Sequence, residues 1–190
     1  MTPDETFEKF KEDVWKTSSA RFNAYRRLRN KNAASIFCIS FLSLFNISMF
    51  IFEWSDALDV NNVSLIFSVF IIIVSLLEFA KDYSVKAERL HVNAMVLTDF
   101  EKSLGLLEGL SEEAHANYST IKRSCPENHE PYDVELFKLG HKVKYYKDEN
   151  AFIFFARSIF VRFKYFISTY GIYVLFICSS IAITFYPYIN

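Results

Sequence analysis

Three residues of the types that catalyse hydrolysis or bind metal ions stand at four-residue spacing in one polar segment: Cys125, His129 and Asp133. A thiolate, an imidazole and a carboxylate in contact can act as nucleophile, base and orienting group, and all three types also bind transition metals. Pro126 and Pro131 interrupt the helix that would align them on one face. We therefore expect no catalysis, no metal site and no cofactor, and we interpret His129 and Asp133 as a hydrogen-bonded pair that fixes this loop.

The glycines and the overall charge argue against the familiar sites for nucleotides and nucleic acids. The four glycines, at positions 105, 109, 140 and 171, form neither a G-x-G-x-x-G nor a G-x4-G-K pattern, so they encode no loop that cradles phosphate. The 21 basic and 22 acidic residues give a net charge of -1, which is not a nucleic-acid footprint. We expect no direct binding of nucleic acid.

A stripe of polar residues runs along the otherwise apolar segment 60–77 and ends at the glutamate that follows it. Its spacing of three and four residues confines it to an arc of about 100 degrees on an ideal helix. Small polar side chains on such a helix either pack against another helix or line a water-filled pore. The ionisable Glu78 favours the pore, because charge near a membrane is usually paired or solvated. The predicted pore-lining residues, with Ile71 as an apolar gate in a cation-favouring pore, are Asn61, Ser64, Ser68, Ile71, Ser75 and Glu78.

Three uncharged runs are long enough to cross a bilayer as helices: residues 33–52, 60–77 and 167–186. A hydrocarbon core about 30 Å thick requires about 20 apolar residues at 1.5 Å per residue. We therefore predict an all-α integral membrane protein with a long-helix transmembrane hairpin and a third, C-terminal span. The alternative for the third run is a buried helix of a soluble region.

The basic residues near these runs all lie at helix ends that would face the same side of a membrane. Five of them precede the first run, further ones follow the second and precede the third, whereas the turn after the first run carries Glu53, Asp56 and Asp59. By the positive-inside rule, the N-terminus and residues 79–165 are expected in the cytoplasm, and the acidic turn and residues 187–190 outside. The predicted location is the cell inner (plasma) membrane, with several passes.

Four segments follow from this pattern. Residues 1–32 are expected to form a cytosolic amphipathic helix, 33–80 a transmembrane hairpin, 81–150 a cytosolic helical region, and 151–190 an interfacial helix with the third span. An N-terminal extension of the third span is the alternative for residues 151–163. A heptad repeat in the cytosolic region predicts a coiled-coil seam for hairpin pairing or self-association, at Tyr83, Leu90, Leu97 and Leu104.

The segment WKTSSARFNAYRRLRNKN (residues 15–32) before the hairpin, together with four later residues, resembles the SLATT family, specifically its fifth subgroup. The later residues, for which the resemblance implies a signalling contact, are Tyr118, Asn128, His129 and Asp133. The resemblance covers most of the chain. It implies a bacterial inner-membrane effector of anti-phage defence that oligomerises and perforates the membrane when a partner senses infection. That partner would be a defence reverse transcriptase or a nucleotide-signalling protein.

Topology, polar stripe and resemblance together predict an oligomeric, pore-forming effector that is not an enzyme and that contacts membrane lipid. The third predicted span departs from the two-span pattern of the family. The alternative function is a non-conducting membrane scaffold that holds and regulates a partner enzyme, such as a reverse transcriptase or a nucleotidyltransferase. A scaffold would use the same spans but would pass no ions when triggered.

Overall fold

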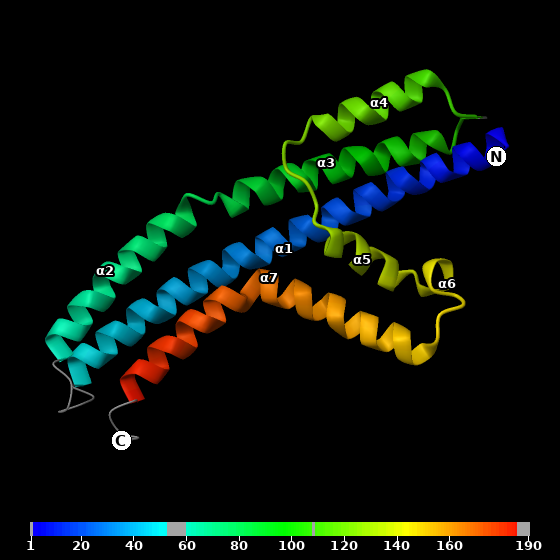
Figure 1. Cartoon of the computed structure of the whole chain (residues 1–190). Coiled ribbons are helices and arrows are strands. Elements are labelled where there is room, and N and C mark those ends of the chain that lie inside the picture. Colours follow the sequence, from blue (N-terminus) through cyan, green and yellow to red (C-terminus); the bar gives the residue numbers. More distant parts are fainter. Residues whose placement is uncertain (1, 53–59, 108, 186–190) are drawn as a thin grey trace. The chain divides into compact units, whose positions relative to one another are not determined.

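A computed structural model describes residues 2–52, 60–107 and 109–185, and every regular element in these ranges is a helix (Figure 1). No strand occurs in this part of the chain, so the predicted all-α fold is confirmed. The elements in chain order are α1 (Pro3–Phe52), α2 (Val60–Phe79), α3 (Tyr83–Leu104), α4 (Glu112–Arg123), α5 (Pro131–Gly140), α6 (Lys142–Tyr145) and α7 (Ala151–Phe185).

Three helical stretches of the described chain are long and apolar enough to cross a membrane, and each covers most of one predicted span. The helix α1 has 50 residues, which corresponds to about 75 Å at 1.5 Å per residue, so it is much longer than one bilayer crossing. Residues 151–163 are the first part of α7, within the same helix as the third apolar run. The acidic turn at Glu53, Asp56 and Asp59 lies outside the described residues.

The chain divides into two compact units, and both α1 and α7 contribute to each of them. The first, called here the polar unit, contains Met1–Arg29 and Ser84–Tyr165. The second, called the apolar unit, contains Asn30–Tyr83 and Phe166–Asn190. The predicted four-segment division stays a prediction, and the two units are described separately below.

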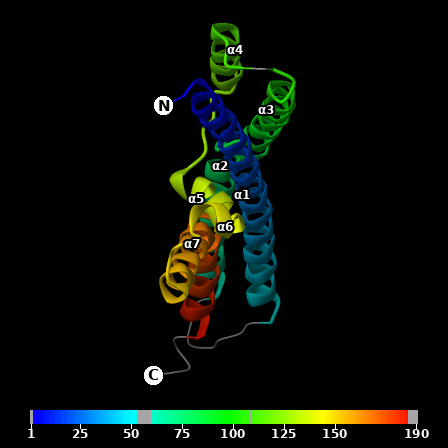
Figure 2. The ribbon, with the colours of Figure 1, turned by 90° about the vertical axis from the view of Figure 1, so that its right-hand side faces the viewer.

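Helix α1 packs against α3 and α4 in the core of the polar unit (Figures 1 and 2). Its start is capped reciprocally, since the Glu5 amide donates to Thr2 Oγ1 and the Thr2 amide donates to Glu5 Oε2. Apolar residues at helical spacing then form the buried core cluster Phe7, Phe10, Val14, Phe100, Leu104 and Ala114.

The heptad seam of α3 lies mostly inside the polar unit. Leu90, Leu97 and Leu104 are completely buried, and Leu90 packs in a second cluster with Ala24 of α1 and with Cys125. Tyr83, the first residue of α3, belongs to the apolar unit and is partly exposed. The seam therefore pairs α1 with α3 within one protomer, which is one of the two roles predicted for it, and self-association stays a prediction.

The second half of α1, helix α2 and the second half of α7 pack together in the apolar unit (Figure 1). Their shared core contains Cys38, Leu42, Ile71 and Tyr173. The outward faces are unusually apolar for a surface: a large share of the side chains of Phe37, Leu65, Ile72, Leu76 and Leu175 is exposed. Apolar patches of this extent are unfavourable in water but suit a helix surface in contact with lipid.

The connection between α2 and α3 is a tight turn at residues 80–82. Asp82 adopts φ of 50°, in the left-handed region that aspartate tolerates better than most residues. This turn follows Phe79, so the apolar helix ends one residue after Glu78, the last residue of the polar stripe. The stripe and its acidic end consequently lie on one helix.

Candidate functional site

The polar stripe of α2 faces the interior of the apolar unit, where it meets α1. Asn46 Nδ2 of α1 donates to Ser68 Oγ over 2.9 Å, and Ser68 Oγ donates in turn to the Ser64 carbonyl over 2.9 Å. Asn46 is buried, and its Oδ1 has no hydrogen-bond partner among the described residues. Polar contacts of this kind join helices in a membrane, but an unpaired carbonyl oxygen there is costly.

Ile71 closes the middle of the stripe with apolar contacts. It packs in the shared core with Cys38 and Leu42 of α1 and with Tyr173 of α7. One turn further on, Ser75 Oγ donates to the Ile71 carbonyl over 2.7 Å. The serine hydroxyl is therefore satisfied by its own helix, and the position of the predicted gate is filled by side chains from α1 and α7.

Glu78 joins the three helices at the end of the stripe. The residue is 8% exposed, and its carboxylate accepts a hydrogen bond of 2.6 Å from the Tyr173 hydroxyl and forms an ion pair with Lys81. Ser35 of α1 is buried and lies close enough to this carboxylate to interact with it. Because a buried carboxylate requires partners, these contacts hold α7 and α1 against the end of α2.

The structure thus brings Ser64, Ser68, Ile71, Ser75 and Glu78 together on one inward face. Asn61 belongs to α2, but its side chain lies outside the described part of the chain. Tyr173, which completes the network from α7, was missed by the sequence analysis and had no recognisable signal there. Asn46, which completes it from α1, stands out in the sequence as a polar residue in the first apolar run. Lining of a pore by these residues stays a prediction.

Asp133 is the centre of a second buried network, in the polar unit. Its side chain is 0% exposed, and Arg27 of α1 donates to both carboxylate oxygens, from Nε over 3.2 Å and from Nη2 over 3.0 Å. Glu130 and Asp133 also form a capping box at the start of α5, with the Glu130 amide 2.9 Å from Asp133 Oδ2. Asn23 Nδ2 donates to the Asp133 carbonyl over 2.9 Å, so two residues of α1 anchor α5.

The electrostatics of this pair favour the charged form of Arg27. Burial by itself would lower the pKa of Arg27, but the hydrogen bonds and the charge of Asp133 raise it above its ordinary value. The Arg27 guanidinium also lies over the Tyr132 ring, 5.2 Å from its centroid. The arrangement is that of a structural anchor whose fork-shaped geometry fixes one orientation of α5.

The other residues of the predicted signalling loop have separate surroundings. The Tyr118 hydroxyl is 2.9 Å from Thr17 Oγ1, and its ring packs against the α1 and α3 core. Asn128 Oδ1 accepts from the His129 amide over 3.0 Å. His129 Nδ1 is buried without a hydrogen-bond partner among the described residues, while Asp133 takes its hydrogen bonds from Arg27 and Glu130.

Cys125 and His129 have surroundings unlike those of a catalytic pair. Cys125 is buried, and its thiol donates a hydrogen bond of 3.7 Å to a Glu127 carboxylate oxygen. Burial, followed by the charge of Arg21, lowers the pKa of His129 and favours its neutral form. In the residues that the structure describes, no group of three His, Cys, Asp or Glu side chains is arranged to hold a metal ion.

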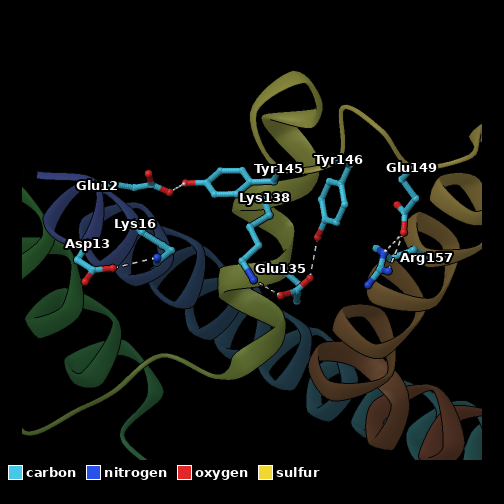
Figure 3. Close-up of polar contacts among 9 residues, drawn as sticks. All are labelled: Glu12, Asp13, Lys16, Glu135, Lys138, Tyr145, Tyr146, Glu149 and Arg157. Carbon is cyan, nitrogen blue, oxygen red and sulfur yellow. Dashed lines mark hydrogen bonds and ion pairs between the residues drawn. The ribbon is translucent and has the colours of Figure 1, made fainter. Parts of the chain in front are cut away.

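A third polar network connects α1, α5, α6 and the first part of α7 within the polar unit (Figure 3). Tyr145 donates to Glu12 over 2.8 Å and Tyr146 donates to Glu135 over 2.8 Å. Burial and the Glu135 carboxylate raise the pKa of Tyr146 to about 12, so its hydroxyl stays protonated and donating. These contacts, with the ion pair of Arg157 and Glu149 at 2.7 Å, tie the segment before α7 to the rest of the unit.

Comparison with known proteins identifies one family. The family described as SMODS and SLOG-associating 2TM effector domain family 5, abbreviated SLATT, matches residues 3–186. No curated protein and no solved structure matches the chain. The match includes both the segment at residues 15–32 and helix α5, and the structure joins them through the contacts of Asn23 and Arg27 with Asp133.

Proposed function

The chain belongs to the fifth SLATT family of membrane effectors, and from this membership we propose that it forms an ion-conducting pore in a membrane. The three membrane-length helices make it a multi-pass membrane protein, in keeping with an effector that acts on the bilayer. The pore would be built from several copies, because the described part of one protomer offers three such helices around a filled core. The activity needs no catalytic residue, and we propose that the chain is not an enzyme.

The polar interior of the apolar unit is the observation that carries this proposal. A helix that serves only as an anchor can be apolar throughout, whereas α2 carries Ser64, Ser68, Ser75 and Glu78 on one face. Buried polar groups in a membrane are expensive and commonly mark ion pathways. In our proposal the stripe is buried inside the resting protomer and becomes exposed to water in the pore when several protomers assemble.

Helix α7 would keep this stripe closed in the resting state. Tyr173 contributes both its ring to the core around Ile71 and its hydroxyl to Glu78. Phe176 lies one turn further along and packs edge-on against Phe70 of α2, with ring centroids 5.7 Å apart. Because the family is named for two transmembrane helices, a third helix in contact with the stripe is suited to a regulatory role.

The second candidate function is a non-conducting scaffold, and a specific observation favours it. Within a single protomer, Ser68 and Glu78 already have polar partners, as expected of a seam that only packs helices. The unpaired Oδ1 of Asn46 argues for the pore instead, because a finished packing seam should satisfy it. A scaffold would hold a partner enzyme such as a reverse transcriptase or a nucleotidyltransferase.

The decisive experiment compares two neighbouring positions of α2, Ile71 on the closed inner face and Ile72 on the exposed one. Ile71→Ser should hydrate the constriction and depolarise cells without a trigger, because a polar ring no longer excludes water. Ile72→Leu is the matched control and should leave the membrane potential unchanged. If both variants remain silent, also in liposomes containing purified protein, the scaffold replaces the pore.

Setting and orientation follow from the charges. We propose the bacterial inner membrane, the N-terminus and polar unit in the cytoplasm, and activation by a defence reverse transcriptase or a nucleotide-signalling partner. The basic residues beside the apolar runs support this orientation. Reporter fusions at Pro126 and Asn190 should report opposite sides of the membrane, and a cytoplasmic signal from both would contradict the three-span topology.

A further inference from the structure

A cavity of about 310 Å³ lies in the polar unit where α4 ends and the following loop begins. This volume is at the lower end of the range of about 300 to 1,000 Å³ typical of small-molecule sites. Its wall contains basic, amide, hydroxyl and carboxylate groups, from Arg21, Ser119, Lys122, Arg123, Glu127 and Asn128.

The charges around this cavity do not balance. Three of the lining side chains are cationic, and the single carboxylate among them, Glu127, is paired with Arg89 over 3.0 Å. The cavity therefore presents a positive surface, supplemented by the Asn128 amide and the Ser119 hydroxyl. Such a surface attracts an anion with several acceptor oxygens.

Arg21 is the buried component of this surface. It is 2% exposed, donates from Nη1 to Asn93 and donates from Nη2 to the Lys122 carbonyl over 3.0 Å. Its Nε is buried without a hydrogen-bond partner in the described chain. Among the residues that the structure describes, no carboxylate pairs with Arg21, whereas Arg27, which is also buried, has Asp133.

The contacts of Arg21 with the end of α4 explain only part of this arrangement. Arg21 and Asn93 cap the last carbonyls of α4, since Asn93 Nδ2 also donates to the Ile121 carbonyl over 2.7 Å. Capping needs neither the free Nε nor a cavity with two further cations at its wall. A buried guanidinium without a counter-charge is unfavourable unless an anion joins it.

We propose that this cavity binds a phosphate-bearing anion, with Arg21 as the buried anchor and Lys122 and Arg123 as contacts nearer the solvent. The phosphate oxygens would supply the acceptors that the Arg21 guanidinium lacks. The site goes beyond pore formation and does not depend on it. Its ligand is either a soluble phosphate compound or the headgroup of an anionic lipid, two sources with the same chemistry.

The test measures pyrophosphate binding by calorimetry to the full chain in nanodiscs of neutral phosphatidylcholine. Wild type should bind, and the double variant Lys122→Gln/Arg123→Gln should lose about tenfold or more in affinity, because charge-assisted contacts are removed. Lys102→Gln/Lys147→Gln is the matched control, with the same change of charge at exposed positions outside the cavity. Its affinity should stay within about twofold of wild type.

Asn128→Asp is a second and more conservative probe of the same cavity. The side chain is exposed and keeps the oxygen that accepts from His129, so the fold should be unaffected. The added negative charge should abolish pyrophosphate binding, since like charges repel. Circular dichroism spectra that match wild type would separate loss of the site from loss of structure.

A second arm identifies the source of the phosphate. In nanodiscs containing phosphatidylglycerol, a headgroup site should block pyrophosphate and retain this lipid through purification, with both effects lost in Lys122→Gln/Arg123→Gln. A site for soluble compounds should bind pyrophosphate equally in both membranes. The proposal is overturned if neither probe binds, or if the cavity variants and the control variant bind alike.

Discussion

Two buried carboxylates, Asp133 in the polar unit and Glu78 in the apolar unit, are held in different ways. Asp133 receives two hydrogen bonds from the rigid guanidinium of Arg27 and one from a backbone amide. Glu78 accepts a hydrogen bond from the Tyr173 hydroxyl and forms an ion pair with the ammonium group of Lys81, whose side chain is 42% exposed. Bidentate arginine fixes geometry, whereas a hydroxyl and a flexible lysine can be exchanged for water at lower cost. The Arg27–Asp133 pair, called here the anchor, is suited to a permanent structural contact. The Tyr173–Glu78 contact, called here the latch, is suited to a contact that opens.

The largest effect is expected at the anchor. Asp133→Ala should lower the free energy of unfolding of the polar unit by about 3 to 5 kcal/mol, because it leaves Arg27 charged, buried and unpaired. Thermal unfolding followed by circular dichroism measures it. Asp99→Ala removes an exposed ion pair with Lys102 and should cost less than about 1 kcal/mol. Equal losses at the two positions would remove the distinction between anchor and surface pair.

A smaller effect on stability, with a visible effect on conduction, is expected at the latch. Tyr173→Phe removes only the hydroxyl that donates to Glu78. A hydrogen bond to a charged group contributes about 1.5 to 3 kcal/mol, so the open population should rise roughly tenfold or more. Basal ion flux from liposomes containing the purified variant is the measurement.

The control for the latch is Tyr170→Phe. Tyr170 is a partly buried residue of the same helix whose ring contacts Phe166. Loss of its hydroxyl should leave basal flux unchanged. If Tyr173→Phe is as silent as this control while Ile71→Ser conducts, the contact with Glu78 is structural and the gate lies elsewhere.

The smallest expected effect is a pH dependence of the stability of the polar unit, which arises from the titration of His129. Burial and the charges of Arg21 and Lys122 lower the folded-state pKa of His129 below its ordinary value of about 6.5, despite the opposing charge of Asp133. Below about pH 6.5 the unfolded chain takes up a proton that the folded form resists. As the pH falls below this value, the free energy of unfolding should therefore decrease, by at most about 1.4 kcal/mol per pH unit. The decrease should level off below the folded-state pKa of His129.

Urea unfolding between pH 7.5 and 5 measures this dependence. His129→Asn should flatten the curve, because the side chain that titrates is removed. A slope that persists unchanged in this variant would assign the pH dependence to other groups.

Much of the helical architecture was predictable from local sequence. The uncharged runs predicted the three membrane-length helices, because backbone hydrogen bonds inside lipid must be satisfied within the segment itself. The heptad of Leu90, Leu97 and Leu104 predicted a buried seam, since residues seven apart lie on one helix face. The spacing of the stripe likewise placed Ser68 and Glu78 on one face of α2.

The sequence by itself thus determined which residues are helical and which of them share a face, because both depend on neighbours within a few turns. The tertiary structure alone decided what each face meets: that the stripe of α2 turns inward to Asn46 and Tyr173, and that Arg27 pairs with Asp133, 106 residues away. Within the described ranges, it also left Arg21 without a carboxylate partner. Such pairings depend on packing between distant segments, where many arginines and carboxylates of one chain are chemically equivalent candidates and only the folded backbone selects among them.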